Sequence, residues 1–303
     1  MRRIVLTLAA AAVLAGCGGS PAAAPPTGPS SGVSAGSTSP ATSTPTSPTP
    51  GPATTPPTSP TATPTTTDGT QPPPWLGTRP LPVTADGFGE VQPTPPELRD
   101  RRFTLPDRLP ELPGSGFASR ITTPAPASVI ARSTWAPGCP VPARRLSWVR
   151  LTFRGFDGAR HTGELLVNRS AATGLVLVFH ALYDARFPIE EMRIPTKPEQ
   201  TAPPTGDGND TAAFNCRVAR GTTTFSEHAY GLAVDVNPFQ NPYLKGDLVL
   251  PELAGAYRDR SWRRPGMIVP RGPVVRAFAA IGWGWGGNWH SLKDLQHFSA
   301  NGR

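Results

Sequence analysis

Residues 117–303 are predicted to fold as an α+β domain with a small antiparallel sheet and flanking helices. Short segments in which apolar and polar residues alternate, a pattern typical of strands, are spread among a few segments with helical periodicity. These segments do not follow the regular strand–helix–strand order of a doubly wound α/β protein, which argues against a parallel sheet. Residues 75–303 together are long enough to bury a core of one domain.

The first half of this region predicts a β-hairpin followed by a helix. Alternation over residues 146–153 and 162–167 indicates two strands, and Gly155-Phe156-Asp157-Gly158 between them is typical of a turn. Apolar residues recur on one face over residues 171–185, which predicts a helix that packs on that face. Pro188 ends this helical pattern.

The second half predicts short strands joined by irregular loops. We expect strands over residues 192–195, 214–217, 231–236 and 295–298, and a helix over residues 273–281. In the strand over residues 231–236, Leu232, Val234 and Val236 would meet the core, because side chains alternate between the two faces of a strand. Asp235 would then face a site on the other side.

The start of the chain has the features of a secretory signal. A basic Met1-Arg2-Arg3 is followed by an apolar run over residues 4–15, which is too short for a comfortable membrane span. The sequence Leu14-Ala15-Gly16-Cys17 resembles a bacterial lipobox, which implies that residues 1–16 are removed and that Cys17 is lipidated. We therefore predict export and a lipid anchor on the outer face of the bacterial cytoplasmic membrane, facing the cell wall. The alternative is a plain signal peptide with an incidental cysteine.

Residues 17–74 are predicted to be the anchor cysteine and a disordered linker. After Cys17 they consist of little besides Gly, Ala, Ser, Thr and Pro, and such a segment cannot bury enough apolar surface to fold. A flexible chain of this length has a mean reach of about 45 Å. Residues 75–116 are rich in proline and charge, and we expect them to form an extended arm.

The net charge indicates which kinds of partner the protein could bind, and the cysteine content indicates the redox state of its compartment. The formal net charge is +8, but the chain has no nucleic-acid motif, so we predict no nucleic-acid partner. The charge then serves either contact with anionic wall polymers or simple solubility. Without Cys17, the remaining pair is Cys139 and Cys216. An even pair in an exported protein suggests a disulfide, and two buried free thiols are the alternative.

Two short motifs contain the residue types of a metal site. Residues 226–235 (SEHAYGLAVD) place His228 seven positions before Asp235, and residues 294–297 (DLQH) end in His297. Two imidazoles and one carboxylate can hold a zinc ion and leave its fourth position open. Asp294, three residues before His297, could accept a proton from water there.

The pattern S-x-H-x-x-G-x-A-x-D followed by D-x-x-H resembles the M15 family of D-alanyl-D-alanine carboxypeptidases and related peptidoglycan peptidases. The resemblance covers about residues 117–303 and extends to residues 138–141, 185–189, 237–238 and 241–243. It implies the α+β zinc peptidase fold that is shared with the Hedgehog signalling domain. It also implies zinc as the cofactor, with His228, Asp235 and His297 as its ligands.

Further roles follow from the same resemblance. Asp294 matches the acid/base of the family, which is commonly Glu, and its alternative role is to support His297. Arg217 matches an arginine that stabilises the oxyanion or pairs with a substrate carboxylate. Apart from the resemblance, substrate contacts are expected from Ser226, which flanks the first ligand, and from Tyr243 and Trp289, for which the alternative is a place in the core. His161 and His180 are assigned structural roles, whereas His290, next to Trp289, is a candidate contact.

Three functions are compatible with these motifs. The first is a monomeric zinc metallopeptidase that hydrolyses peptidoglycan stem peptides, as a D-Ala-D-Ala carboxypeptidase or as an endopeptidase. The second is a non-catalytic, zinc-containing lipoprotein that binds the wall, and the third is an interaction module with a structural zinc. Chelation would unfold the third, whereas an enzyme would lose activity first.

Overall fold

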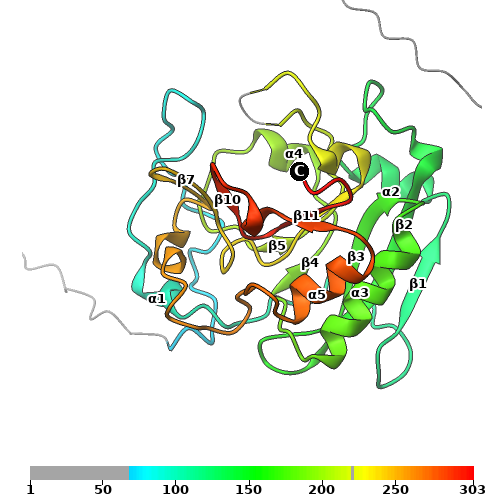
Figure 1. Cartoon of the computed structure of the whole chain (residues 1–303), viewed down its shortest axis with the longest axis horizontal. Helices are drawn as coiled ribbons and strands as arrows, with labels where there is room; N and C mark the ends of the chain where they lie inside the picture. Colours follow the sequence, from blue (N-terminus) through cyan, green and yellow to red (C-terminus); the bar gives the residue numbers. More distant parts are fainter. Residues whose placement is uncertain (1–67, 220–221) are drawn as a thin grey trace, which may run out of the picture. The chain divides into compact units, whose positions relative to one another are not determined.

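Three antiparallel strands form the longest sheet of the protein in a computed structural model that describes residues 68–219 and 222–303 (Figure 1). They are β1 (Ser119–Thr122), β2 (Leu146–Arg154) and β3 (Arg160–Asn168), in the order β1-β2-β3. The ladder between β2 and β3 runs from Leu146 opposite Asn168 to Arg154 opposite Arg160, so the predicted hairpin is confirmed. The predicted signal peptide, Cys17 and most of the linker lie outside the described residues. No helix in the described ranges is long and apolar enough to cross a membrane.

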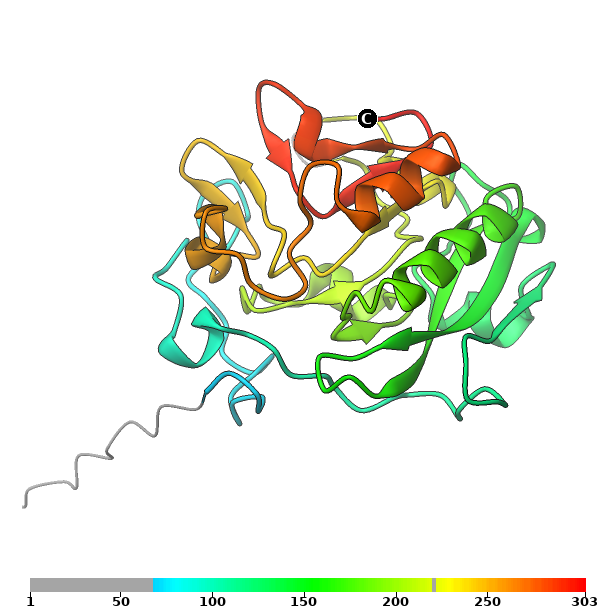
Figure 2. The same ribbon diagram turned by 60° about the horizontal axis from the view of Figure 1, so that its bottom comes forward.

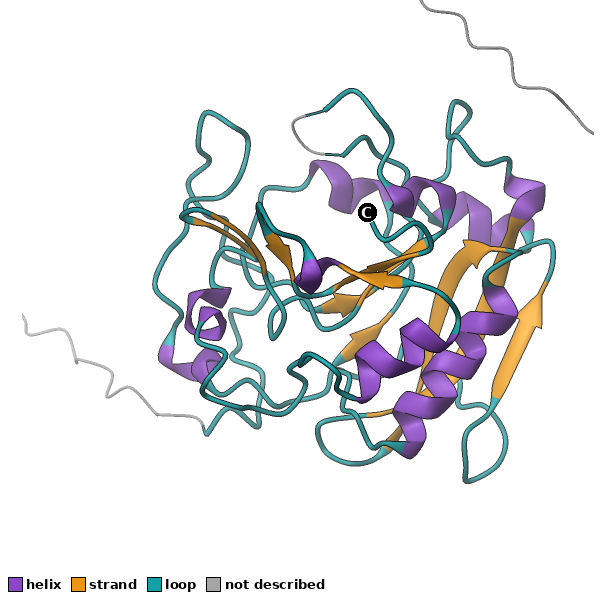
Figure 3. Ribbon diagram, in the orientation of Figure 1, coloured by secondary structure: helices purple, strands orange, loops and turns teal. Residues whose placement is uncertain are grey.

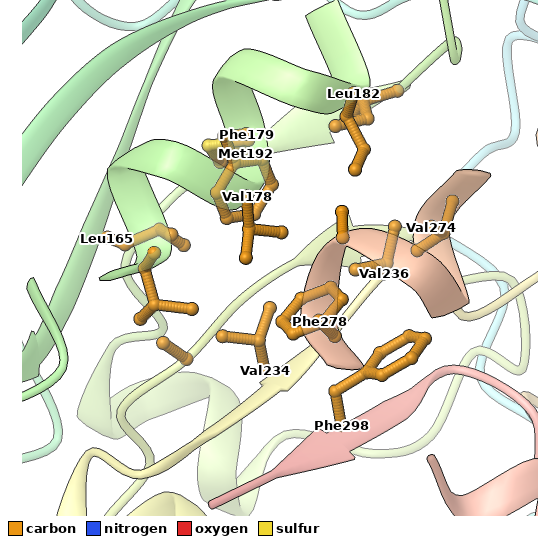
Figure 4. Close-up of a cluster of buried hydrophobic side chains, with 14 of the residues drawn as sticks. Leu165, Val178, Phe179, Leu182, Met192, Val234, Val236, Val274, Phe278 and Phe298 are labelled. Carbon is orange, nitrogen blue, oxygen red and sulfur yellow. The ribbon is translucent and has the colours of Figure 1, made fainter. Parts of the chain in front are cut away.

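One helix lies on this sheet, and a second helix lies beside the first and next to strand β9 (Gly284–Trp285); the main core is enclosed between them (Figures 1 and 2). Helix α3 (Ala172–Asp184) and helix α5 (Pro273–Ala280) confirm the two predicted helices. Figure 4 shows how their buried side chains meet those of the strands, with Phe278 stacked on Phe298 at a centroid distance of 4.0 Å. Full burial of one such side chain stabilises the fold by about 1.5–3 kcal/mol. This core supports the strands that carry the candidate site.

The second sheet brings two distant parts of the sequence together. Strands β6 (Ala233–Asp235), β11 (His297–Ser299) and β9 (Gly284–Trp285) pair antiparallel in the order β6-β11-β9. The register sets His297 directly opposite Asp235. The strand predicted over residues 231–236 is therefore confirmed in its central part, and the last predicted strand begins two residues later than expected.

A third sheet lies next to these strands. It consists of β10 (Lys293–Asp294), β7 (Tyr243–Lys245) and β8 (Leu248–Leu250), in the order β10-β7-β8. Its register sets Asp294 opposite Tyr243. Figure 3 shows the strands of these small sheets in orange and the few helices in purple. The predicted α+β class with small antiparallel sheets and few helices is therefore confirmed.

The strand predicted over residues 214–217 was wrong. The backbone N–H of Phe214 donates to the Leu166 carbonyl of β3, but that of Cys216 donates to the Thr134 hydroxyl. No regular ladder therefore forms over this segment. The strand expected over residues 192–195 is limited to β4 (Glu191–Met192), which pairs parallel with β5 (Asp210–Thr211). The predicted disulfide between Cys139 and Cys216 is present.

The remaining helical elements are short. They are α1 (Pro96–Arg99), α2 (Ala127–Arg132), α4 (Lys197–Thr201), and the 3-10 turns η1 (Ala143–Arg145), η2 (Glu227–Tyr230), η3 (Ala254–Arg258) and η4 (Gly286–Asn288). Turn η2 carries His228, and η4 lies next to β10.

The segment expected to be an arm contributes buried side chains to a second core. Leu98 and Phe103 pack with Phe239 and Tyr257 from the later part of the chain. Arg101 is also buried, at 2% exposure. Its guanidinium donates to both carboxylate oxygens of Glu190 at 2.8 and 2.6 Å. The arm is thus packed against the segment that follows β6 and against η3.

Candidate metal centre

His228, Asp235 and His297 meet at one point (the three predicted ligands). His228 Nε2 lies 3.2 Å from Asp235 Oδ2, and His297 Nδ1 lies 3.1 Å from Asp235 Oδ1. The two ring nitrogens are 3.2 Å apart. Tetrahedral ligands at zinc–nitrogen and zinc–oxygen distances near 2.0–2.1 Å would be separated by about 3.3 Å. The three donor atoms therefore have the spacing of a metal site, as their mutual separations within 4.8 Å also indicate.

The local sequence explains the position of His228. Ser226 caps turn η2, where its hydroxyl accepts a hydrogen bond from the His228 N–H at 3.4 Å. Gly231 ends the turn with φ +67, and a Cβ there would lie 2.5 Å from the Asn168 nitrogen, so this position requires glycine. The chain then enters β6, which carries Asp235.

Main-chain oxygens orient both imidazoles. His228 Nδ1 donates to the Ala213 carbonyl at 2.6 Å, and His297 Nε2 donates to the main-chain oxygen of Arg303 at 3.0 Å. A ring nitrogen that holds the proton leaves the other nitrogen free to ligate. These contacts direct His228 Nε2 and His297 Nδ1 toward the shared point.

The segment that follows β11 is itself held in place. The Ser299 hydroxyl donates to the Arg303 oxygen at 2.6 Å, and the indole N–H of Trp289 donates to the Gly302 carbonyl at 2.7 Å. The Trp289 ring lies 5.5 Å from the His297 ring. In this structure Trp289, predicted as a substrate contact, supports the main-chain oxygen that orients His297.

The charges of the cluster are strongly coupled. Burial alone would raise the pKa of Asp235, but His228 and His297 hold this pKa well below its usual range. Burial opposes protonation of His297, yet the adjacent Asp235 carboxylate raises the pKa of His297 to about 9. Without a metal, these residues form a buried ion pair.

Asp294 lies beside the cluster in a different electrostatic environment. Burial, followed by the negative charge of Asp235, raises the pKa of Asp294 to about 7. Its Oδ1 is shielded from solvent and accepts no hydrogen bond from the residues that the structure describes. Gly286 permits this close packing, because a Cβ there would lie 2.6 Å from the Asp294 carbonyl oxygen. A carboxyl group with a pKa near neutrality can both accept and donate a proton.

Arg217 and Tyr243 flank Asp294. Arg217 lies near enough for its charge to lower the pKa of Asp294, an effect that burial outweighs. Among the described residues, the one hydrogen bond of its guanidinium is from Nη1 to the Val218 carbonyl at 3.3 Å. Tyr243 is half-buried, and burial together with Asp294 raises its pKa. Both side chains keep donors available for a ligand.

The other histidines lie outside the cluster. His161 is placed between Asp107 and Asp157, at 2.9 and 3.1 Å, and His180 stacks on Phe117 at 4.4 Å. These contacts match the structural roles expected for them. His290 is exposed and has no place among the three candidate ligands.

Several contributors could not be found by sequence reasoning. The oxygens of Ala213 and Arg303 are main-chain atoms, which any residue supplies, so the sequence contains no signal for them. Gln296 lies close enough to the Asp294 carboxyl group to lower its pKa. Its position between Asp294 and His297 was the one available clue.

Metal affinity is expected to rise with pH. The raised pKa of about 9 means that His297 is protonated in the metal-free protein at neutral pH, and a protonated nitrogen cannot ligate. Each binding event displaces that proton, so the apparent association constant should increase about tenfold per pH unit below the pKa of His297. The pairing of protonated His297 with Asp235 stabilises the metal-free protein fully below a pH of about 6.5, the ordinary pKa of histidine. This stabilisation is lost as the pH rises through the folded-state pKa of about 9.

Titration with a divalent metal against a chelating dye, at about pH 6 and about pH 8, measures this dependence. Equal affinities at the two pH values would contradict it. Thermal unfolding of the metal-free protein over the same range provides the control, since its stability should change in the opposite direction.

Comparison with known proteins supports a peptidase. Residues 220–300 match a family model described as D-alanyl-D-alanine carboxypeptidase, within the M15 peptidases. No curated protein and no solved structure gives a match. The matched segment includes the three candidate ligands and Asp294, and its similarity to M15 peptidases supports a hydrolase.

Proposed function

We propose that this protein is a zinc-dependent metallopeptidase of the D-Ala-D-Ala carboxypeptidase type that hydrolyses peptidoglycan stem peptides. The observation that carries the proposal is the convergence of His228, Asp235 and His297, with donor atoms 3.1–3.2 Å apart, beside the unpartnered Oδ1 of Asp294. These residues lie in the segment that matches the carboxypeptidase model.

The donor set fits zinc. Two imidazole nitrogens and one carboxylate oxygen, with both imidazoles oriented by main-chain oxygens, match the ligands that zinc prefers in hydrolases. Zinc supplies Lewis acidity, which lowers the pKa of water and polarises a carbonyl group.

Asp294 is proposed as the general base and acid. Its carboxylate would take a proton from the attacking water and later give it to the leaving amine. A pKa of about 7 in the metal-free protein suits a group that both accepts and donates a proton. A bound cation would counteract this rise, because a nearby positive charge favours the carboxylate. The supporting geometry is the packing of Asp294 against Gly286 and its pairing with Tyr243.

Arg217 is proposed to bind negative charge on the substrate. Its guanidinium lies near Asp294 and retains donors that no described residue uses. A planar, permanently charged guanidinium can stabilise the developing oxyanion or pair with a terminal carboxylate. Tyr243 and Ser226 are proposed as further substrate contacts, although Ser226 also caps the turn that carries His228.

The proposed setting is the outer face of the bacterial cytoplasmic membrane, with Cys17 as lipid anchor and a monomeric peptidase domain in the wall. The motif at residues 14–17 and the composition of the linker support this proposal. Incorporation of labelled palmitate that persisted in Cys17→Ser would argue against it.

The decisive experiment is digestion of purified muropeptides by the zinc-loaded protein, followed by mass spectrometry. Loss of one terminal alanine is expected, and a split stem or cross-bridge would establish an endopeptidase instead. Zinc bound at one per chain with every muropeptide uncut would overturn the proposed enzyme and favour a wall-binding lipoprotein.

A further inference from the structure

We propose that two adjoining grooves across the Cys139–Cys216 disulfide bind the remote, carboxylate-bearing part of the peptide substrate. This inference rests on the proposed function, because it adds a second subsite to the same reaction. It predicts that the preferred substrate is an acidic peptide several residues long rather than an isolated dipeptide.

The grooves are continuous with each other. The first has a volume of about 510 Å³ and lies along α2, where Ile130 and Trp135 form part of its apolar lining. The second has a volume of about 630 Å³ and lies over the disulfide, where it reaches Phe225. Both are lined by Pro137 and Lys197, so they share a boundary.

One segment of chain forms a wall of both the second groove and the metal centre. The Ala213 carbonyl accepts from His228 Nδ1 at 2.6 Å, and the Asn215 N–H donates to the His228 carbonyl at 3.1 Å. The next residue, Cys216, lines the groove. At the other end of the groove wall, Phe225 directly precedes Ser226, the cap of the turn that carries His228.

A side chain from α4 fixes this wall. Gln200 Nε2 donates to Asn215 Oδ1 at 2.6 Å and to the Cys216 carbonyl at 3.1 Å, and Gln200 itself lines the groove. The disulfide attaches the same segment to the loop at Cys139. The wall that the groove shares with the metal centre is therefore held by covalent and hydrogen bonds.

The charge of the grooves selects an anionic occupant. Arg144 and Lys197 are the charged residues of the two linings; both are exposed, and neither forms an ion pair within the described residues. The nearest acid in sequence, Glu199, is already paired with Arg193 at 2.7 Å and bonded to the Thr196 N–H. An apolar surface with unneutralised cations complements a peptide that has small apolar side chains and a free carboxylate, as stem peptides do.

This surface would contribute to specificity through binding energy remote from the scissile bond.

The test uses a groove variant, Arg144→Glu/Lys197→Glu, and a control variant, Arg120→Glu/Arg169→Glu. The residues of both pairs are exposed, and both double substitutions change the net charge by the same amount. Neither control residue lines a groove. A milder Arg144→Gln/Lys197→Gln variant removes the cations without adding repulsion.

Calorimetry on the zinc-loaded proteins, each also carrying Asp294→Ala so that no peptide is cut during the titration, would use three ligands: a pentapeptide that contains one glutamate and ends in D-Ala-D-Ala, its glutamine analogue, and D-Ala-D-Ala itself. The groove variant should bind the glutamate peptide about tenfold more weakly, because it loses two exposed ion pairs with the peptide. Its affinity for the other two ligands should stay within about twofold of the unchanged protein. The control variant should bind all three as the unchanged protein does.

An equal loss in the control variant would overturn the groove, since only net charge would then matter. So would unchanged peptide binding combined with lost binding to polyglycerol phosphate, which would identify an anionic polymer as the occupant. If the unchanged protein bound none of the three ligands, the proposed function itself would fail, and this inference with it. Normal binding of D-Ala-D-Ala with no preference for the glutamate peptide would refute the groove alone.

Discussion

Replacement of Asp294 by alanine is expected to lower kcat by about 10²–10⁴-fold while the protein keeps its metal. The expected loss is large because this carboxylate would handle the proton in both halves of the reaction. Metal retention is expected because the three donor atoms of the cluster come from His228, Asp235 and His297. Asp294 also helps to raise the pKa of His297, but Asp235 contributes more to this effect, so removal of Asp294 should perturb the metal-free cluster only modestly.

The measurement pairs turnover of a D-Ala-D-Ala peptide with elemental analysis of bound zinc. His228→Ala provides the opposite control, since it should lose metal and turnover together. Asp294→Glu tests whether the length of this side chain limits proton transfer, because it keeps the carboxylate and adds one methylene group. Glu is also the residue common at this position in the M15 family. Activity of Asp294→Ala near that of the unchanged protein would remove Asp294 from the mechanism. Loss of zinc from that variant would make Asp294 a supporting residue of the metal centre instead.

The candidate ligands could be predicted because their chemistry is local in sequence. The turn at His228, the Gly231 that ends it and the alternation around Asp235 occur within ten residues, and each has a physical signature. The oxygens that orient the imidazoles could not be predicted, because they belong to backbone at Ala213 and Arg303. The sequence was therefore sufficient to select the three residues that converge, whereas the orientation of their side chains depended on tertiary structure.

The same contrast holds for the fold. The nine-residue strands β2 and β3 and the thirteen-residue helix α3 are long enough for periodicity to identify them. Strands of two residues, such as β10 with Asp294, are too short to show any period. At residues 214–217 the sequence predicts a strand that the structure does not contain. The apolar residues there are buried, but a disulfide and irregular hydrogen bonds hold the segment in place of a strand ladder.

The arm is the least predictable part of the fold, because Arg101 is a buried charged residue and charged residues are usually exposed. Arginine is almost never fully buried unless it is paired, and no sequence feature near Arg101 identifies its partner 89 positions later. The pairing depends on the packing of Phe103 and Phe239, whose rings lie 5.0 and 4.5 Å from the guanidinium. Glu190 in turn accepts from Asn209 at 2.7 Å.

Substitution of Arg101 by leucine is expected to lower the free energy of unfolding by about 3–5 kcal/mol, the cost of an uncompensated buried charge. Glu190 is completely buried and would keep only Asn209 as a hydrogen-bond donor to its carboxylate among the described residues. Urea unfolding of Arg101→Leu and of Arg102→Leu measures the difference. Arg102 is a matched control because its side chain is 41% exposed and its ion pairs are on the surface, where such changes cost about 0–1 kcal/mol.

Two further measurements separate lost charge pairing from lost packing. Arg101→Leu/Glu190→Leu removes both charges, so it should recover much of the stability that Arg101→Leu loses. Burial raises the pKa of Glu190, and Arg101 opposes this effect. In Arg101→Leu the carboxyl pKa should rise further, so the destabilisation should shrink as the pH falls and Glu190 becomes neutral. A cost that is independent of pH and is not recovered in the double variant would instead assign the role of Arg101 to its contacts with Phe103 and Phe239.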